Sequence, residues 1–69
     1  MIERFEALLI AAGYRIVAVQ SEGAFFTYTL QEDEEQEPLD VFINRDFIED
    51  EPANGLAFVR MIFSRRDRL

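Results

Sequence analysis

Apolar side chains at helical spacing mark the beginning of the chain. They recur at intervals of three or four positions and are Ile2, Phe5, Leu8, Leu9 and Ala12. On a helix these side chains form one stripe, and the charged residues between them face water. Gly13 follows, and glycine commonly ends a helix because it accepts a left-handed backbone conformation. The pattern therefore predicts a helix over residues 1–13.

Beyond Gly13, the apolar positions follow the pattern of strands. Four runs are rich in apolar, β-branched or alternating residues: 14–20, 24–30, 39–43 and 56–63. Residues 21–23 are suited to a short turn after the first run, and Asn54 with Gly55 is suited to a turn before the last. Strands joined by short turns usually pair with their neighbours in antiparallel order. We therefore expect four antiparallel strands.

The residues between the third and fourth runs, 44–55, have the composition of a connection. Asp46 could cap a single helical turn, with Glu49 reaching back to it, and Pro52 would end that turn. The expected fold is thus a single α+β domain over residues 1–69. Its N-terminal helix packs on a four-stranded antiparallel β-meander (α-β-β-β-β, sheet residues 14–63), and a polar, basic tail follows (residues 64–69).

One helix covers only one face of such a sheet, so the other face should carry exposed apolar side chains. By alternation, the candidates for that face are Phe25, Phe42, Leu56, Phe58 and Ile62. An aromatic surface of this size is usually covered by a partner. We expect a homodimer or a docked protein there. The alternative is that these residues belong to the core.

Composition excludes several kinds of chemistry. The chain has 69 residues, with no cysteine and no histidine, which excludes disulfides, thiolate chemistry and the usual general base at neutral pH. No stretch approaches the roughly 20 apolar residues of a membrane span, and the layout of a signal peptide is absent. We expect a cytoplasmic protein that binds no cofactor.

Negative charge is concentrated in the middle of the chain. The segment from Glu22 to Glu51 holds eleven acidic residues and one arginine, whereas residues 60–69 hold four arginines and one aspartate. The net charge of the whole chain is −7. Most of this surface would repel nucleic acid and attract a basic partner. We therefore expect no direct binding of nucleic acid.

The densest cluster of carboxylates occupies residues 32–37 and consists of Glu32, Asp33, Glu34, Glu35 and Glu37. It lacks the glycine and the ligand spacing of a calcium loop, so we expect no metal site. Paired carboxylates can catalyse glycoside hydrolysis, but only in a cleft that a chain of this size hardly provides. We expect no enzymatic activity. The cluster could also serve only to keep a loop solvated.

The spacing of the cluster suggests that it could imitate nucleic acid. Five charges over six extended residues amount to one per about 4 Å, compared with one per about 3.4 Å along a single DNA strand and about 1.7 Å along a duplex. A second acidic segment could add a parallel row if the fold brings it near. That segment consists of Asp46, Glu49, Asp50 and Glu51.

By its length, its composition and these two acidic segments, the chain resembles the small acidic inhibitors encoded by phages, which include DNA mimics and anti-CRISPR proteins. The resemblance implies a non-enzymatic inhibitor in the host cytoplasm that blocks a nucleic-acid-binding site on a basic protein. It carries over no residue roles. The arginine-rich tail departs from a purely acidic mimic and could pair with the protein's own carboxylates or with those of a second subunit.

These observations lead to one functional hypothesis and one rival. In the first, both acidic segments dock on the basic surface of a protein partner, with Phe47 and Ile48 as candidate apolar anchors unless they attach their segment to the core. In the rival, the protein has a structural, assembly or chaperone-like role and uses the aromatic sheet face as its interface. The acids would then only keep the protein soluble.

Overall fold

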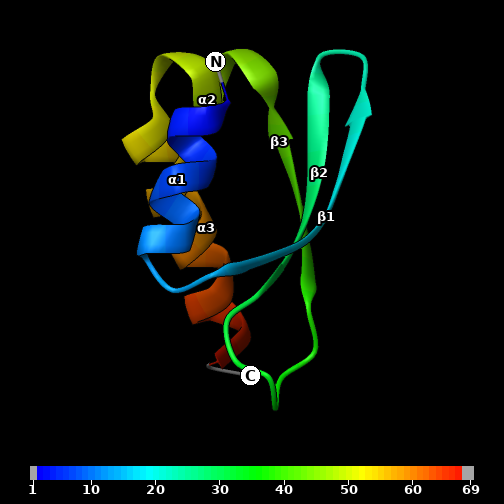
Figure 1. Ribbon diagram of the computed structural model, residues 1–69, viewed down its shortest axis with the longest axis vertical. Helices are drawn as coiled ribbons and strands as arrows, with labels where there is room; N and C mark the ends of the chain where they lie inside the picture. Colours follow the sequence, from blue (N-terminus) through cyan, green and yellow to red (C-terminus); the bar gives the residue numbers. More distant parts are fainter. Residues whose placement is uncertain (1, 68–69) are drawn as a thin grey trace.

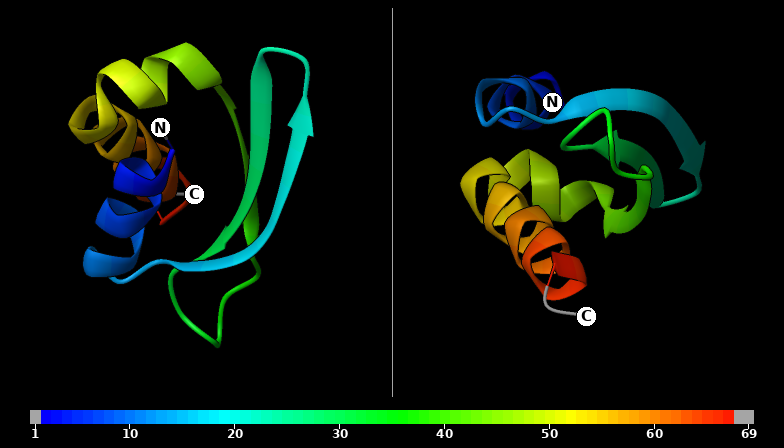
Figure 2. Two further views of the ribbon diagram at one scale, coloured as in Figure 1. Left: turned by 45° about the horizontal axis from the view of Figure 1, so that its top comes forward. Right: turned by 90° about the horizontal axis from the view of Figure 1, so that it is seen from below.

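The computed structural model describes residues 2–67 as a three-stranded sheet with helices on one side (Figures 1 and 2). The elements follow in the order α1 (Glu3–Ala11), β1 (Arg15–Glu22), β2 (Phe25–Gln31), β3 (Leu39–Asn44), α2 (Arg45–Asp50) and α3 (Pro52–Asp67). The strands are antiparallel and lie in the order β1-β2-β3. The fold is α+β and begins with a helix, but the predicted four-stranded meander is wrong.

The correction lies in α3, where a fourth strand was predicted. Pro52 opens this helix, because its missing amide hydrogen is not needed at the first helical position. The buried residues Gly55, Val59 and Phe63 are spaced by four, so they form one stripe facing the core. Gly55 therefore lies inside a helix and not in the turn predicted from Asn54 and Gly55.

The predicted division of the chain changes accordingly. The sheet spans residues 15–44 and not 14–63, and the chain from residue 45 to residue 67 is mostly helical. Arg65 and Arg66 form part of the last turn of α3 and do not belong to a separate tail. Arg68 and Leu69, the end of the predicted basic tail, lie outside the described residues.

Helix α1 ends at the glycine that the sequence indicated. Gly13 has a φ of 96°, which side chains with a Cβ rarely adopt. Its amide donates to the carbonyl of Ile10, and the Tyr14 amide donates to the carbonyl of Leu9. This pair of hydrogen bonds is a Schellman motif, which satisfies carbonyls at the end of the helix. It turns the chain from α1 into β1.

Helix α2 begins one residue before the predicted cap. The side chain of Asn44 accepts hydrogen bonds from the amides of Asp46, at 2.8 Å, and Phe47, at 3.3 Å. Asn44 is also the last residue of β3. The N-cap is therefore Asn44 and not Asp46, and strand and helix join without an intervening loop.

The core lies between the sheet and the three helices. Strand β2 contributes Phe26, Tyr28 and Leu30, and β3 contributes Val41 and Ile43. The helices contribute Phe5, Leu9, Ile48, Val59 and Phe63. Most of these side chains are completely shielded from solvent. The edge strand β1 extends beyond the helices, and all of its residues except Ile16 are exposed.

Tyr28 places a polar group inside this core. Its hydroxyl donates to Oε2 of Glu6 at 2.9 Å, and its ring contacts Phe5 edge-on, with the centroids 5.3 Å apart. Burial raises the pKa of Tyr28 well above its usual value of about 10, and the hydrogen bond to Glu6 and the charge of Glu6 raise it further. Tyr28 therefore keeps its proton in the folded protein when an unfolded tyrosine would lose it.

We expect this difference to weaken the fold at alkaline pH. The contribution of Tyr28 is complete below about pH 10 and is lost progressively above it, because the unfolded chain then binds fewer protons than the folded one. The chain has no lysine and no cysteine, so its two tyrosines are the side chains that titrate in this range. Urea unfolding at several pH values from about 8 to about 11 should show a steeper loss of stability for the wild type than for Tyr28→Phe. Equal slopes would contradict the assignment.

Candidate functional site

The acidic cluster forms the loop between β2 and β3, hereafter the acidic loop (residues 32–38). Every residue of this loop is exposed, including all five carboxylates of the sequence prediction. In Figure 1 the loop occupies the lower end of the molecule, beyond the sheet. The charges are therefore directed to solvent at one end of the long axis.

The loop is turned, and not extended as the charge-spacing estimate assumed. The Gln36 amide donates to the carbonyl of Asp33, and the Glu35 amide donates to Oδ1 of Asp33, each at 3.0 Å. The side chain of Gln31, at the end of β2, donates to the carbonyl of Gln36 at 3.0 Å. Because the chain reverses over residues 33–36, the carboxylates form a cluster and not a straight row.

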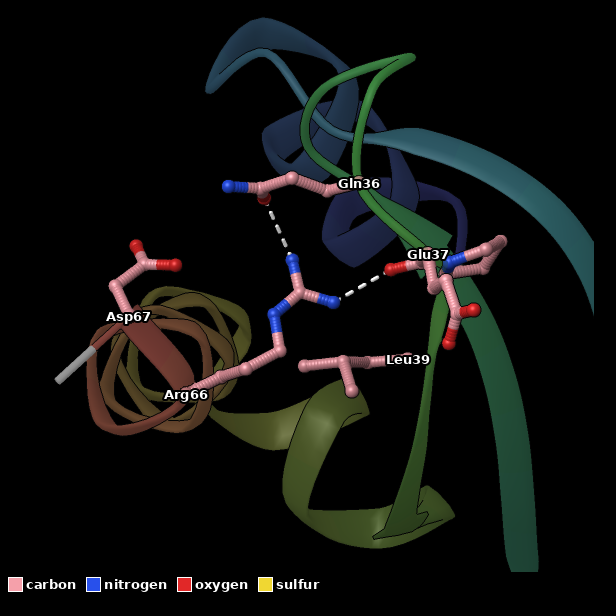
Figure 3. Close-up of a pocket in the computed structure, with 6 residues that line it drawn as sticks. Gln36, Glu37, Leu39, Arg66 and Asp67 are labelled. Carbon is pink, nitrogen blue, oxygen red and sulfur yellow. Dashed lines mark hydrogen bonds between the residues drawn. The ribbon is translucent and has the colours of Figure 1, made fainter. Parts of the chain in front are cut away.

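Arg66 on α3 attaches the loop to the rest of the protein. Figure 3 shows its guanidinium between Gln36 and Glu37, with Nη2 donating to Oε1 of Gln36 at 2.7 Å and Nη1 donating to the carbonyl of Glu37. The same guanidinium lies over the ring of Phe63, with Cζ 5.0 Å from the centroid. The sequence suggested that the arginine-rich end could pair with the protein's own carboxylates, but Arg66 donates to a side-chain amide oxygen and to a backbone carbonyl of the loop. This contact joins two segments about 30 residues apart in the chain.

An open pocket of about 510 Å³ lies beside this attachment. Its lining combines polar and apolar side chains and consists of Gln36, Glu37, Pro38, Leu39, Arg66 and Asp67 (Figure 3). Nearby, burial raises the pKa of Tyr14, and the negative charge of Glu32 raises it further. The positive charge of Arg60 opposes this effect. Of the arginines, Arg66 is the one shown in contact with the acidic loop within residues 2–67.

We expect removal of the Arg66 guanidinium to loosen the acidic loop. In Arg66→Met, the apolar stem is retained but both hydrogen bonds to the loop are lost. Amide exchange at Gln36 should then accelerate roughly threefold to tenfold, in line with about 0.5–1.5 kcal/mol for a net hydrogen bond. Arg65→Met, at the exposed neighbouring position, is the matched control. The same acceleration in both variants would show that loss of charge, and not loss of the contact, loosens the loop.

The second acidic segment lies at the other end of the molecule. Asp46, Glu49 and Asp50 belong to α2 and Glu51 follows it, at the upper end in Figure 1. Strand β3 separates them from the acidic loop, and its six residues extend about 20 Å at the usual strand rise. The two segments therefore do not form the parallel rows that would resemble a duplex.

Two acidic residues of this second segment lie at the starts of helices, where they stabilise the helix. Asp46 lies in the first turn of α2, where the helix dipole favours negative charge. Glu51 precedes α3, where its carbonyl accepts from the Gly55 amide and its carboxylate accepts from Asn54. Ile48 is completely buried, so it attaches α2 to the core. Phe47 is exposed over 39% of its surface.

The predicted aromatic face is only partly present. Phe25 and Phe42 lie on the face of the sheet that points away from the helices. Leu56, Phe58 and Ile62 lie on α3, where they are half-buried and pack against the core. They cannot belong to a sheet face, because the predicted fourth strand is a helix.

Comparisons with known proteins do not assign this site. The chain matches no protein-family model, no curated protein and no solved structure. Within residues 2–67, no group of three or more acidic side chains is arranged to hold a metal ion. Over the same residues, none of the helices has both the length and the hydrophobicity needed to cross a bilayer.

Proposed function

We propose that the protein is a non-enzymatic binding protein whose acidic loop docks on a basic, nucleic-acid-binding surface of a protein partner. The observation that carries this proposal is a cluster of exposed carboxylates in a loop that hydrogen bonds connect to β2 and α3. A loop needed only for solubility would gain nothing from such attachment. A loop that binds would lose less conformational entropy on docking.

The placement of charge also supports docking through this loop. Within residues 2–67, Asp33 is the one residue of the loop whose carboxylate accepts a hydrogen bond, from the backbone amide of Glu35. Glu32, Glu34, Glu35 and Glu37 are exposed and close in sequence, and such like charges destabilise the compact state. A basic partner would relieve this repulsion. On the α2 side, by contrast, helix ends already stabilise some of the acids.

Competition with nucleic acid follows from the same chemistry. A basic surface that accepts phosphates also accepts carboxylates, because both offer clustered anionic oxygens to arginine and lysine. The turned loop covers a compact patch of such a surface and does not trace a strand of DNA. We therefore propose that it blocks part of a nucleic-acid site by occupying it, as an inhibitor would.

Affinity capture tests this function. Tagged protein should retain a partner from a lysate of the cells that express it at about 0.05 M salt and release it at about 0.5 M, because salt screens exposed charges. Added DNA or RNA should compete with the capture, and the purified partner should bind that nucleic acid. Retention at high salt, or capture that nucleic acid does not affect, would contradict the proposal.

A further inference from the structure

The open face of the sheet carries a stacked pair of phenylalanines. The rings of Phe25 on β2 and Phe42 on β3 have centroids 4.6 Å apart and planes inclined by 12°. Phe42 is exposed over 59% of its surface and Phe25 over 37%. Helices cover the other face of the sheet (Figure 2). The pair therefore offers aromatic surface to solvent without a role in the core.

Carboxylates flank this aromatic pair on both sides. Glu22 is the direct cross-strand partner of Phe25. At the usual strand spacing, the backbones of these two residues are about 4.8 Å apart. Asp40 lies two residues before Phe42 on the same strand and face. At the usual rise per residue, their Cα atoms are about 6.6 Å apart along the strand. Its Oδ1 accepts a hydrogen bond from Thr29 at 2.7 Å. Both carboxylates are exposed, so a cation over the rings would lie near negative charge.

This arrangement suits arginine better than lysine. A guanidinium is planar, stacks on an aromatic face and can still donate from its edge to a carboxylate. An ammonium is more strongly hydrated and cannot stack. A contact between a guanidinium and a phenylalanine ring also occurs within this chain, where the guanidinium carbon of Arg45 lies 4.9 Å from the ring centroid of Phe26.

We propose that Phe25 and Phe42, with Glu22 and Asp40, bind an arginine side chain of the basic partner. The inference rests on the proposed function and extends it, because exposed charge accelerates association more than it stabilises a complex. A stable complex needs an anchor with buried contact area. Strands β2 and β3 run between the acidic loop and α2 (Figure 1), and Phe25 pairs with Asn44, the N-cap of α2, so the aromatic pair lies toward the α2 end of the sheet. A basic partner that contacts both the loop and the anchor must span most of the sheet, about 20 Å.

Two peptides of equal charge test the proposal without knowledge of the partner. Capped hexa-arginine should bind the wild type about threefold to fivefold more tightly than capped hexa-lysine at low salt, and it should shift the ring resonances of Phe25 and Phe42. Phe42→Leu keeps the apolar bulk but removes the ring, so the two peptides should bind it equally. Circular dichroism verifies that this variant is folded. Asp40→Asn is a second and milder variant, and it should reduce the preference for hexa-arginine over hexa-lysine.

The controls separate this proposal from the proposed function. Replacing Glu32, Glu34, Glu35 and Glu37 by lysine should weaken the binding of both peptides. The ratio of the two affinities should stay unchanged. If the wild type binds both peptides equally, or if Phe42→Leu retains the preference, the arginine site is wrong and docking by the loop is unaffected. A preference lost in Phe47→Ala but kept in Phe42→Leu would place the anchor on α2 and would also overturn the proposal. If neither peptide binds the wild type, both proposals fail.

Discussion

Replacing Glu32, Glu34, Glu35 and Glu37 by lysine should abolish capture of the basic partner and leave the fold intact. All four side chains are exposed, and Asp33 is retained because its carboxylate and carbonyl form the turn of the loop. The four substitutions change the net charge by +8, from −7 to +1. The association rate should fall by about tenfold to a thousandfold at low salt, because steering is lost. Surface plasmon resonance with the purified partner measures this rate.

A matched pair of double variants tests whether the loop or the overall charge is responsible. Glu34→Lys with Glu35→Lys and Asp46→Lys with Asp50→Lys each change the net charge by +4 at exposed positions, but at opposite ends of the protein. We expect the loop variant to lose most of the binding and the α2 variant to lose little. Equal losses would mean that the partner responds to total charge, and docking through the loop would be wrong.

Gly55→Leu should unfold the protein or come close to doing so. A Cβ at Gly55 would lie 2.8 Å from Cε1 of Phe5 and 3.0 Å from Cγ2 of Ile48, and both of these side chains are completely buried. Leucine would gain about 0.8 kcal/mol of helix propensity but would overpack the core at a cost of about 3 kcal/mol or more. A domain of 69 residues has a total stability of roughly 3–10 kcal/mol. Urea unfolding followed by circular dichroism measures the loss.

Ala57→Leu is the control for this substitution. It introduces the same side chain on the same helix at an exposed position, so its stability should stay within about 0.5 kcal/mol of the wild type. The comparison also distinguishes the two folds. If Gly55 lay in the turn predicted from the sequence, leucine would meet no buried ring there. Similar stabilities for the two variants would therefore contradict the packing of α3 against α1.

The parts of the fold that were predictable depend on contacts within short segments. The stripe of Phe5 and Leu9 and the stop at Gly13 are local, and so are the alternating residues of β2 and β3. The segment 56–63 has apolar residues at almost every position, so neither the helical nor the strand period dominates. Its helix is favoured because Val59 and Phe63 can then reach the core, a choice made by distant residues.

Some features of the candidate site were likewise predictable from the sequence, and others were not. The sequence alone identifies the carboxylates of residues 32–37 and their exposure, because charge and a break in the apolar pattern are local properties. It could not show that Arg66 holds the loop from α3. Nor could it show that the second acidic segment lies at the far end, because that separation follows from the direction of β3.

The sequence by itself thus determined a small acidic α+β domain with a charged loop between two strands. Only the tertiary structure decided that the sheet has three strands, that α3 covers it, and that Phe25 and Phe42 alone of the five predicted aromatic-face residues lie on its open side. The physical reason is burial. Local spacing limits each segment to a few conformations, and the choice among them depends on which one shields the most apolar surface in the assembled chain.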